Sequence, residues 1–207
     1  MLATAGRLFE RQGYARTTFD EIAAASGFAV ATVYKYFPSK ERIVVALLQP
    51  DLERILALGQ AVIERPPDDP ADAMVGLLSR YRDLGGHNWA SREILRLTVF
   101  PRLDNGGLLS EFIRDADARV QGQIRLLLET LRRRGRLAPG LPLDDATAIL
   151  FALLNQHFGA FLADGASRFT QTFRRLARTI RLVFDDWRPP PGPRRRRRRP
   201  AAGGSRR

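Results

Sequence analysis

The sequence contains no cysteine and only two histidines, so it lacks the residues of a disulfide framework or a thiolate metal site. Its apolar stretches are too short to cross a bilayer, and the N-terminus has no signal-peptide pattern. The HExxH, GxSxG, GxGxxG and Walker motifs of common enzymes are also missing. We therefore expect a cytoplasmic protein that is not an enzyme and uses no metal or other cofactor.

Lysine is scarce as well, because the chain has only Lys35 and Lys40 against 32 arginines. The formal net charge is +12, but nine of the arginines lie in residues 188–207, which contain no acid; without them the net charge is +3. Most of the positive charge is therefore terminal. The total charge is weak evidence that the folded part binds nucleic acid.

The most informative stretch follows Thr18 and reads FDEIAAASGFAVATVYKYFPSK. Thr18 and Glu21 have the spacing of a capping box, so a helix should begin directly after Thr18. Gly27 can end it in a left-handed conformation, and Phe28 can fill the space beneath the turn. A second helix over residues 29–37 should stop before the following proline. The pattern predicts two short helices joined by a tight turn.

The second of these helices should present a mixed polar face to solvent. With Val33 directed inward, Ala31 and Lys35 point away from the core. The shoulders on either side carry Val30, Thr32, Tyr34 and Tyr36. Such a face suits a groove lined by phosphates and base edges, as in a helix–turn–helix that enters the DNA major groove. The alternative is an ordinary helical hairpin whose exposed face is only solvated.

The residues Thr18-x-x-x-Ile22-Ala23, Gly27 and the run from Thr32 to Lys40, TVYKYFPSK, resemble the DNA-binding domain of the TetR (tetracycline-repressor) family. The resemblance covers about residues 2–48 and beyond them concerns only architecture and length. It implies a dimeric transcriptional regulator, most simply a repressor released from a palindromic operator by a small molecule. The expected phosphate contacts are Thr18, Thr32, Tyr36 and Lys40. The residues expected to face the bases are Val30, Ala31, Tyr34 and Lys35.

Two features depart from the family pattern. Ala29 stands where the family usually has serine, so the second helix lacks a side-chain cap, at a cost of about 1 kcal/mol. Met1 lies almost inside the first expected helix, whereas family members usually carry several residues before it. The true start of the chain therefore remains open.

The remaining pattern predicts an all-α protein of about nine helices. We expect a helix–turn–helix domain at residues 1–48, a helical regulatory and dimerisation domain at 49–187 and a tail at 188–207. A long helix from Lys40 should kink at Pro50 and join the two domains, so its tilt could carry a signal. Further helices are expected at about 71–84, before Pro101, at 108–134, from 144, and at 167–187.

The helices at about 144–163 and 167–187 are expected to form a homodimer interface. The first has too many apolar residues for one stripe, and the second has apolar residues at heptad positions 169, 173, 176, 180, 183 and 187. These features suit a two-fold four-helix interface, which the family resemblance also implies. The alternative is that both helices only complete the monomer core. A dimer would hold two recognition helices about 34–36 Å apart, the spacing of successive major grooves.

The resemblance also implies a pocket for a small-molecule effector among the fifth to eighth helices. The sequence supplies aromatic and polar side chains there, which suit a largely apolar ligand oriented by a few hydrogen bonds. The candidates are Tyr81, His87, Trp89, Phe100, Phe112, Asn155, His157 and Phe158. The alternative is that these side chains only pack the core.

The tail combines PPPGP with six consecutive arginines, cannot bury a core and should be disordered. It is either a salt-sensitive arm for DNA or a solvated extension. If the tail is an arm for DNA, a second class of function is possible. It is a sequence-tolerant DNA-coating or architectural protein driven by this tail.

Overall fold

The computed structural model describes the backbone of residues 1–82, 107–164 and 169–190, and all regular structure in these ranges is α-helical. The helix expected before Pro101 lies outside the described residues. Within them, none of the helices combines the length and apolarity that a membrane span requires.

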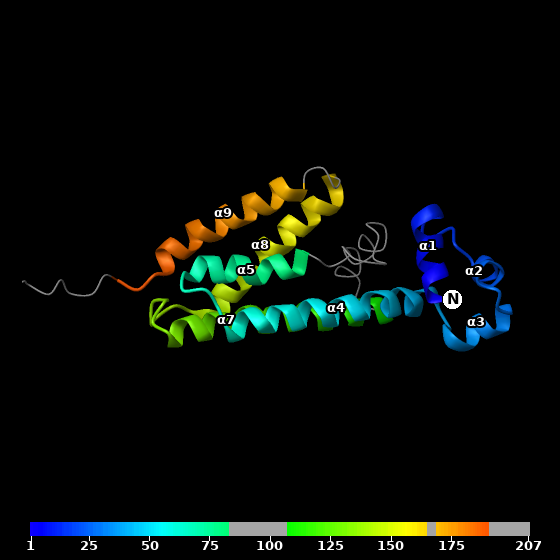
Figure 1. Cartoon of the computed structure of the whole chain (residues 1–207), viewed down its shortest axis with the longest axis horizontal. Helices are drawn as coiled ribbons and strands as arrows, with labels where there is room; N and C mark the ends of the chain where they lie inside the picture. Colours follow the sequence, from blue (N-terminus) through cyan, green and yellow to red (C-terminus); the bar gives the residue numbers. More distant parts are fainter. Residues whose placement is uncertain (83–106, 165–168, 191–207) are drawn as a thin grey trace, which may run out of the picture.

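Three short helices gather at one end of the elongated molecule (Figure 1). They are α1 (Leu2–Gln12), α2 (Phe19–Ser26) and α3 (Val30–Tyr36). Their buried side chains, together with those at the start of α4 (Lys40–Glu64) and of α7 (Leu108–Arg133), form one hydrophobic cluster, which we call the small core. Its fully buried members include Phe9, Ile22, Val33 and Val44. The small core sets the orientation of α3.

Local signals in the sequence place the ends of these helices as expected. Thr18 Oγ1 accepts a hydrogen bond from Glu21 N at 3.2 Å, and Glu21 Oε2 accepts one from Thr18 N at 2.8 Å, which completes the capping box. Gly27 ends α2 with φ of 72°, a left-handed conformation that favours glycine. Phe28 was expected to fill the space beneath this turn, and that expectation is wrong: its side chain is 47% exposed.

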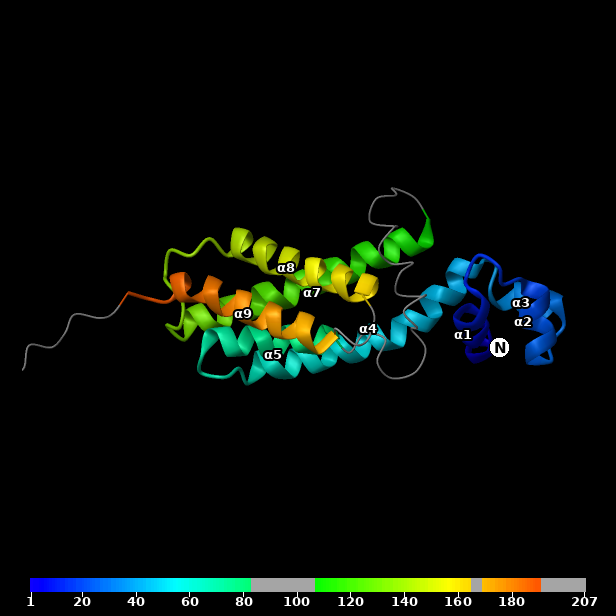
Figure 2. The same cartoon turned by 90° about the horizontal axis from the view of Figure 1, so that it is seen from above.

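The long helix α4 joins the N-terminal helices to the rest of the molecule (Figures 1 and 2). Ser39 Oγ accepts a hydrogen bond from Arg42 N at 3.3 Å and caps its start. The helix continues through Pro50 to Glu64. Because one continuous helix crosses the expected domain boundary at residue 48, a change in its tilt would reach both parts of the molecule.

The second part of the molecule is a layered helical bundle. Its helices are α5 (Pro70–Arg82), α7, α8 (Leu143–Asp164) and α9 (Phe169–Trp187). Figures 1 and 2 show α7 lying along α4, with α5, α8 and α9 completing the bundle. A second cluster of buried side chains, which we call the large core, joins α4, α5, α7, α8 and α9.

Four of the heptad positions of α9 face this chain's own core. Leu176 and Ile180 are buried members of the large core, and Phe173 and Trp187 pack against it. The interpretation of this seam as a dimer interface is therefore wrong for these residues. A heptad pattern identifies a buried stripe on a helix, but it does not determine whether the same chain or a second one covers that stripe.

Candidate DNA-binding surface and effector cavity

The helix α3 turns one face to solvent at the end of the molecule. Tyr34 and Tyr36 are 50% and 67% exposed, and Ala31 and Lys35 are exposed beside them. On the opposite side Val33 is completely buried in the small core. The sequence pattern therefore identified the exposed side of this helix correctly.

Two of the expected contact residues on α3 are only half-exposed. Val30 packs against the small core, and Thr32 is likewise at intermediate exposure. Tyr34 is held in place by the ring of Phe19, which stacks on it with centroids 4.4 Å apart and an interplanar angle of 28°. This stacking restricts the ring and hence the direction of the exposed phenol.

Thr18 is exposed, but its side chain serves the cap of α2. Its hydroxyl accepts from Glu21 N and lies 3.0 Å from Glu21 Oε2. Hydrogen bonds from the Thr18 backbone, and then from Gln12 and the Thr18 hydroxyl, lower the pKa of Glu21. The carboxylate is therefore ionised at neutral pH and stays available to complete the cap. A contact between Thr18 and a DNA phosphate remains a prediction.

Lys40 is engaged within the protein. Its Nζ donates to the carbonyl oxygens of Tyr14, Ala15 and Thr17 at 2.9, 3.2 and 3.1 Å, and it lies 4.7 Å from the centroid of the Tyr14 ring. An ammonium group has three donors, so these carbonyls occupy all of them. This geometry makes Lys40 a link between α4 and the α1–α2 connection, and it argues against the expected phosphate contact, which stays untested.

An apolar cavity of about 90 Å³ lies among α4, α5, α7 and α8. Its walls come from both hydrophobic cores, since Leu48 and Ile113 belong to the small core and Leu52, Ile55 and Val120 to the large one. The other lining residues are Tyr81, Phe112, Ala116, Asp117, Phe151, Leu154, Asn155 and Phe158. The cavity therefore lies at the junction between the N-terminal helices and the helical bundle.

The structure brings together part of the set of effector-binding candidates. Tyr81, Phe112, Asn155 and Phe158 line the cavity. His157 does not, and its Nδ1 lies 2.7 Å from the Leu153 carbonyl oxygen of its own helix. The candidates His87, Trp89 and Phe100 lie outside the described residues.

Most of the cavity wall carries no signal in the sequence that sets it apart. The sequence gives no reason to distinguish Leu48, Leu52 and Ile55 on α4 from ordinary core residues of a linking helix. Asp117 is a charged residue between two apolar positions of α7 and carries no signal that sets it apart. Only the packing of α7 against α4 and α8 brings these side chains to one place.

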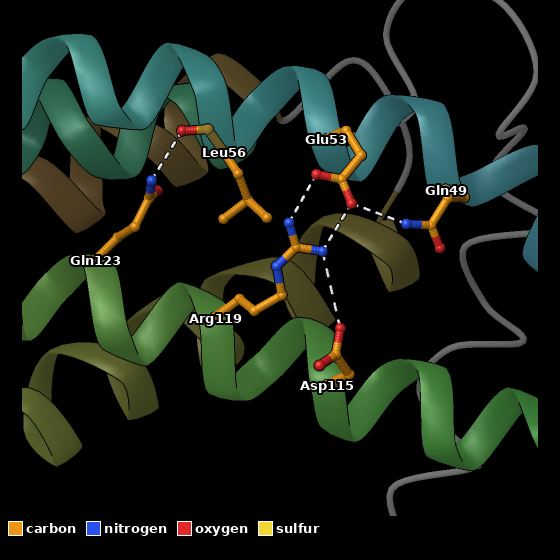
Figure 3. Close-up of polar contacts among 6 residues, drawn as sticks. All are labelled: Gln49, Glu53, Leu56, Asp115, Arg119 and Gln123. Carbon is orange, nitrogen blue, oxygen red and sulfur yellow. Dashed lines mark hydrogen bonds and ion pairs between the residues drawn. The ribbon is translucent and has the colours of Figure 1, made fainter.

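A polar relay leads from the cavity to the backbone of α4. The hydroxyl of Tyr81 donates to Gln123 Oε1 at 2.7 Å, and Gln123 Nε2 donates to the Leu56 carbonyl oxygen at 2.8 Å. Burial raises the pKa of Tyr81, so the phenol stays protonated and remains a donor. Figure 3 shows Gln123 reaching from α7 to Leu56 on α4.

A second set of polar contacts joins the same two helices nearer the start of α4 (Figure 3). Arg119 on α7 forms two hydrogen bonds of 2.7 Å with the two carboxylate oxygens of Glu53 on α4. Gln49 Nε2 donates to Glu53 Oε1 at 2.8 Å, and Asp115 Oδ2 lies 3.8 Å from Arg119 Nη1. These contacts fix the register of α4 against α7.

Comparison with known proteins agrees with this geometry. Residues 1–47 match the family described as bacterial regulatory proteins, tetR family. The HTH-type transcriptional regulator EthR of Mycolicibacterium smegmatis is 28% identical over 168 residues, which cover 79% of this chain and 74% of that protein. EthR of Mycobacterium tuberculosis (strain H37Rv) is 31% identical over 94 residues, or 44% of each chain.

Solved structures share the fold over nearly the whole chain. A TetR/AcrR family regulator from Thermobifida fusca has a TM-score of 0.66 at 22% identity, covering 86% of this chain and 93% of its own. SmeT, solved as a complex with triclosan, has a TM-score of 0.68 at 19% identity. The match covers 90% of this chain and 89% of the SmeT chain. Residues 1–47 thus carry the DNA-binding domain of the tetR family, the similarity to EthR supports a TetR family transcriptional regulator, and the solved structures share the fold of the whole chain.

Proposed function

We propose that this regulator binds a palindromic operator as a homodimer in the cytoplasm, and that a small, largely apolar molecule in the cavity releases it. The observation that carries the proposal is the position of the cavity. Leu48 and Ile113 belong to the small core that orients α3, and both line the cavity beside members of the large core. A ligand there would touch the residues that hold the DNA-binding end in place.

The structure offers a physical route for the release. Packed cores switch between discrete arrangements and do not deform continuously, so a ligand that separates α4 from α7 should reposition the whole start of α4. A ligand shifts such an equilibrium only by its difference in affinity for the two arrangements. Contacts with Leu48 and Ile113 would supply that difference, because these side chains pack in the small core with the DNA-binding end.

The cavity lining supports a mainly apolar ligand with one or two polar groups. Most of the wall is aliphatic or aromatic, while Asn155 and Asp117 supply an amide and a carboxylate. Tyr81 contributes its ring, because its hydroxyl is already bonded to Gln123. The SmeT complex with triclosan supports a small organic ligand for a protein of this fold.

The proposed dimer interface lies on the exposed sides of α8 and α9. Ile149 and Leu182 are 46% and 70% exposed, and Ala148 and Ala152 are exposed on α8. Exposed apolar side chains and small residues on neighbouring helices suit packing against a second copy. This interface differs from the heptad seam, which the large core already covers.

For DNA binding we propose that Ala31, Tyr34 and Lys35 face the bases and that Thr32 and Tyr36 contact phosphates. All five lie on the exposed or half-exposed side of α3. Val30 packs against the small core. The Thr18 hydroxyl caps α2, and the Lys40 ammonium donates to backbone carbonyls of the protein itself. We expect their substitution to act mainly through the fold.

Selection of binding sites from random duplex DNA tests the proposal, with the whole chain and a version ending at Trp187 compared. We expect both proteins to enrich the same inverted pair of half-sites. The tail-driven alternative predicts no enriched sequence and loss of binding when the tail is removed. If the shortened protein folds but binds no DNA, the proposal is wrong.

A further inference from the structure

The first turn of α3 presents methyl groups and almost no hydrogen-bonding side chains. Ala29 and Ala31 are exposed, Val30 is half-buried, and Thr32 is the first residue with a hydroxyl. Ala29 makes no side-chain cap to the helix. Phe28, directly before this turn, is 47% exposed. The start of the helix is therefore an apolar surface at the end of the molecule.

This surface has a consequence for the bases that it can accept. In helix–turn–helix proteins the N-terminal residues of the second helix contact base edges. A base edge whose donors and acceptors lie against methyl groups loses its water without gaining a partner, which costs free energy. Among the four bases, only thymine presents a methyl group in the major groove, at C5.

We propose that Ala31 is a specificity-determining residue that selects thymine in each half-site through contact with the C5-methyl group. The inference rests on the proposed function, in which α3 enters the major groove. Ala31 is the exposed residue of the first turn that points away from Val33, the buried anchor of the helix. Lys35 follows one turn later on the same side and supplies the polar part of the readout.

The test removes each methyl group in turn. In the site selected by the whole chain, every thymine is replaced singly by deoxyuridine, which lacks only the C5-methyl, and affinity is measured for each duplex. We expect one thymine in each half-site at which uracil weakens binding about fourfold, the effect of one buried methyl group. Equal affinity for thymine and uracil at every position would overturn the proposal.

The Ala31→Gly protein assigns the effect to this residue. Its ratio of affinities for the thymine and uracil duplexes should fall to about one at the sensitive position, because the methyl partner is gone. Any loss of helix stability in this variant acts equally on both duplexes and cancels in the ratio. An unchanged ratio would assign the methyl contact elsewhere and overturn the role of Ala31.

Two further variants keep the result interpretable. Gly76→Ala, on α5, leaves α3 unchanged and should keep the fourfold ratio. If Ala31→Gly does not fold, Ala31→Ser places a hydroxyl at the contact and should also lower the ratio. Absence of any enriched site would contradict the proposed function itself, whereas an enriched site with equal thymine and uracil affinities contradicts only this inference.

Discussion

Arg119 on α7 and Glu53 on α4 meet through two parallel hydrogen bonds of 2.7 Å, a bidentate pairing of guanidinium with carboxylate. The two side chains are 36% and 50% exposed, so solvent screens their attraction. The pairing nevertheless specifies one register of α4 against α7. Their sequence neighbours Leu52 and Val120 line the cavity.

The pair predicts a non-additive response to mutation. Arg119→Met and Glu53→Gln should each cause a small loss of stability, and the double variant should be no less stable than the worse single one. Urea unfolding of the four proteins measures this. Asp115→Asn is the control, because its carboxylate lies 3.8 Å from Arg119 and should matter less. Fully additive losses would show that the pairing contributes nothing.

The same pair predicts a dependence on pH. The hydrogen bond from Arg119 is the main reason that the pKa of Glu53 lies below its ordinary value of 4.5. A group with a lowered pKa in the folded protein stabilises it above the ordinary value and loses that contribution as pH falls through the folded value. The stability difference between wild type and Glu53→Gln should hold from neutral pH to about 4.5 and shrink below it. If the stability difference between wild type and Glu53→Gln vanishes near pH 6, or persists in strong acid, the carboxylate of Glu53 does not stabilise the protein in this way.

Gly59 on α4 gives a test of the relay between Tyr81, Gln123 and Leu56. A Cβ at Gly59 would lie 2.4 Å from Gln123 Oε1 and 3.1 Å from Leu77 Cδ1, so Gln123 would have to move. We expect Gly59→Ala to destabilise the protein by about 1–2 kcal/mol despite the better helix propensity of alanine. Denaturant unfolding gives the value.

The matched control for Gly59 is another glycine within a helix. A Cβ at Gly76 on α5 would have Val62 Cγ1 at 3.8 Å, an ordinary contact. Gly76→Ala should therefore stabilise the protein by about 0.5–1 kcal/mol. If Gly59→Ala proves as stabilising as Gly76→Ala, the relay does not hold Gln123 in place.

Ala29 offers a stabilising substitution at the DNA-binding end. It is the N-cap of α3, with φ of −67° and ψ of 144°, and makes no side-chain cap. Ala29→Ser should add a hydrogen bond to a free amide of the first turn and stabilise the protein by about 1 kcal/mol. In the control Ala24→Ser, within α2, the lower helix propensity of serine should give a slight loss. Thermal unfolding that shows no gain for Ala29→Ser would mean that the first turn needs no cap.

The sequence predicted most of the helix bounds because their signals are local. The Thr18 and Glu21 capping box, the left-handed Gly27 and the Ser39 cap each depend on residues within four positions. Long-range partners were not predictable in this way. Gln123 bonds to Tyr81, 42 residues away, and to the Leu56 carbonyl, 67 residues away.

Periodicity and a family motif describe a residue without its surroundings. The heptad positions Leu176 and Ile180 are buried as expected, but this chain's own α5 and α8 lie against α9 there. Lys40 matches the family motif, yet its ammonium lies among carbonyl oxygens of the α1–α2 connection. In both cases the side chain's role depends on which element lies opposite, which only the folded structure determines.

If α3 reads a specific operator, footprinting on the DNA beside the protein's own gene should reveal the site. Wild type should protect a two-fold symmetric site. Lys35→Ala, at an exposed position, should fold normally and lose at least about fivefold in affinity for that site relative to random DNA. A Lys35→Ala protein with the footprint and sequence preference of wild type would contradict this account.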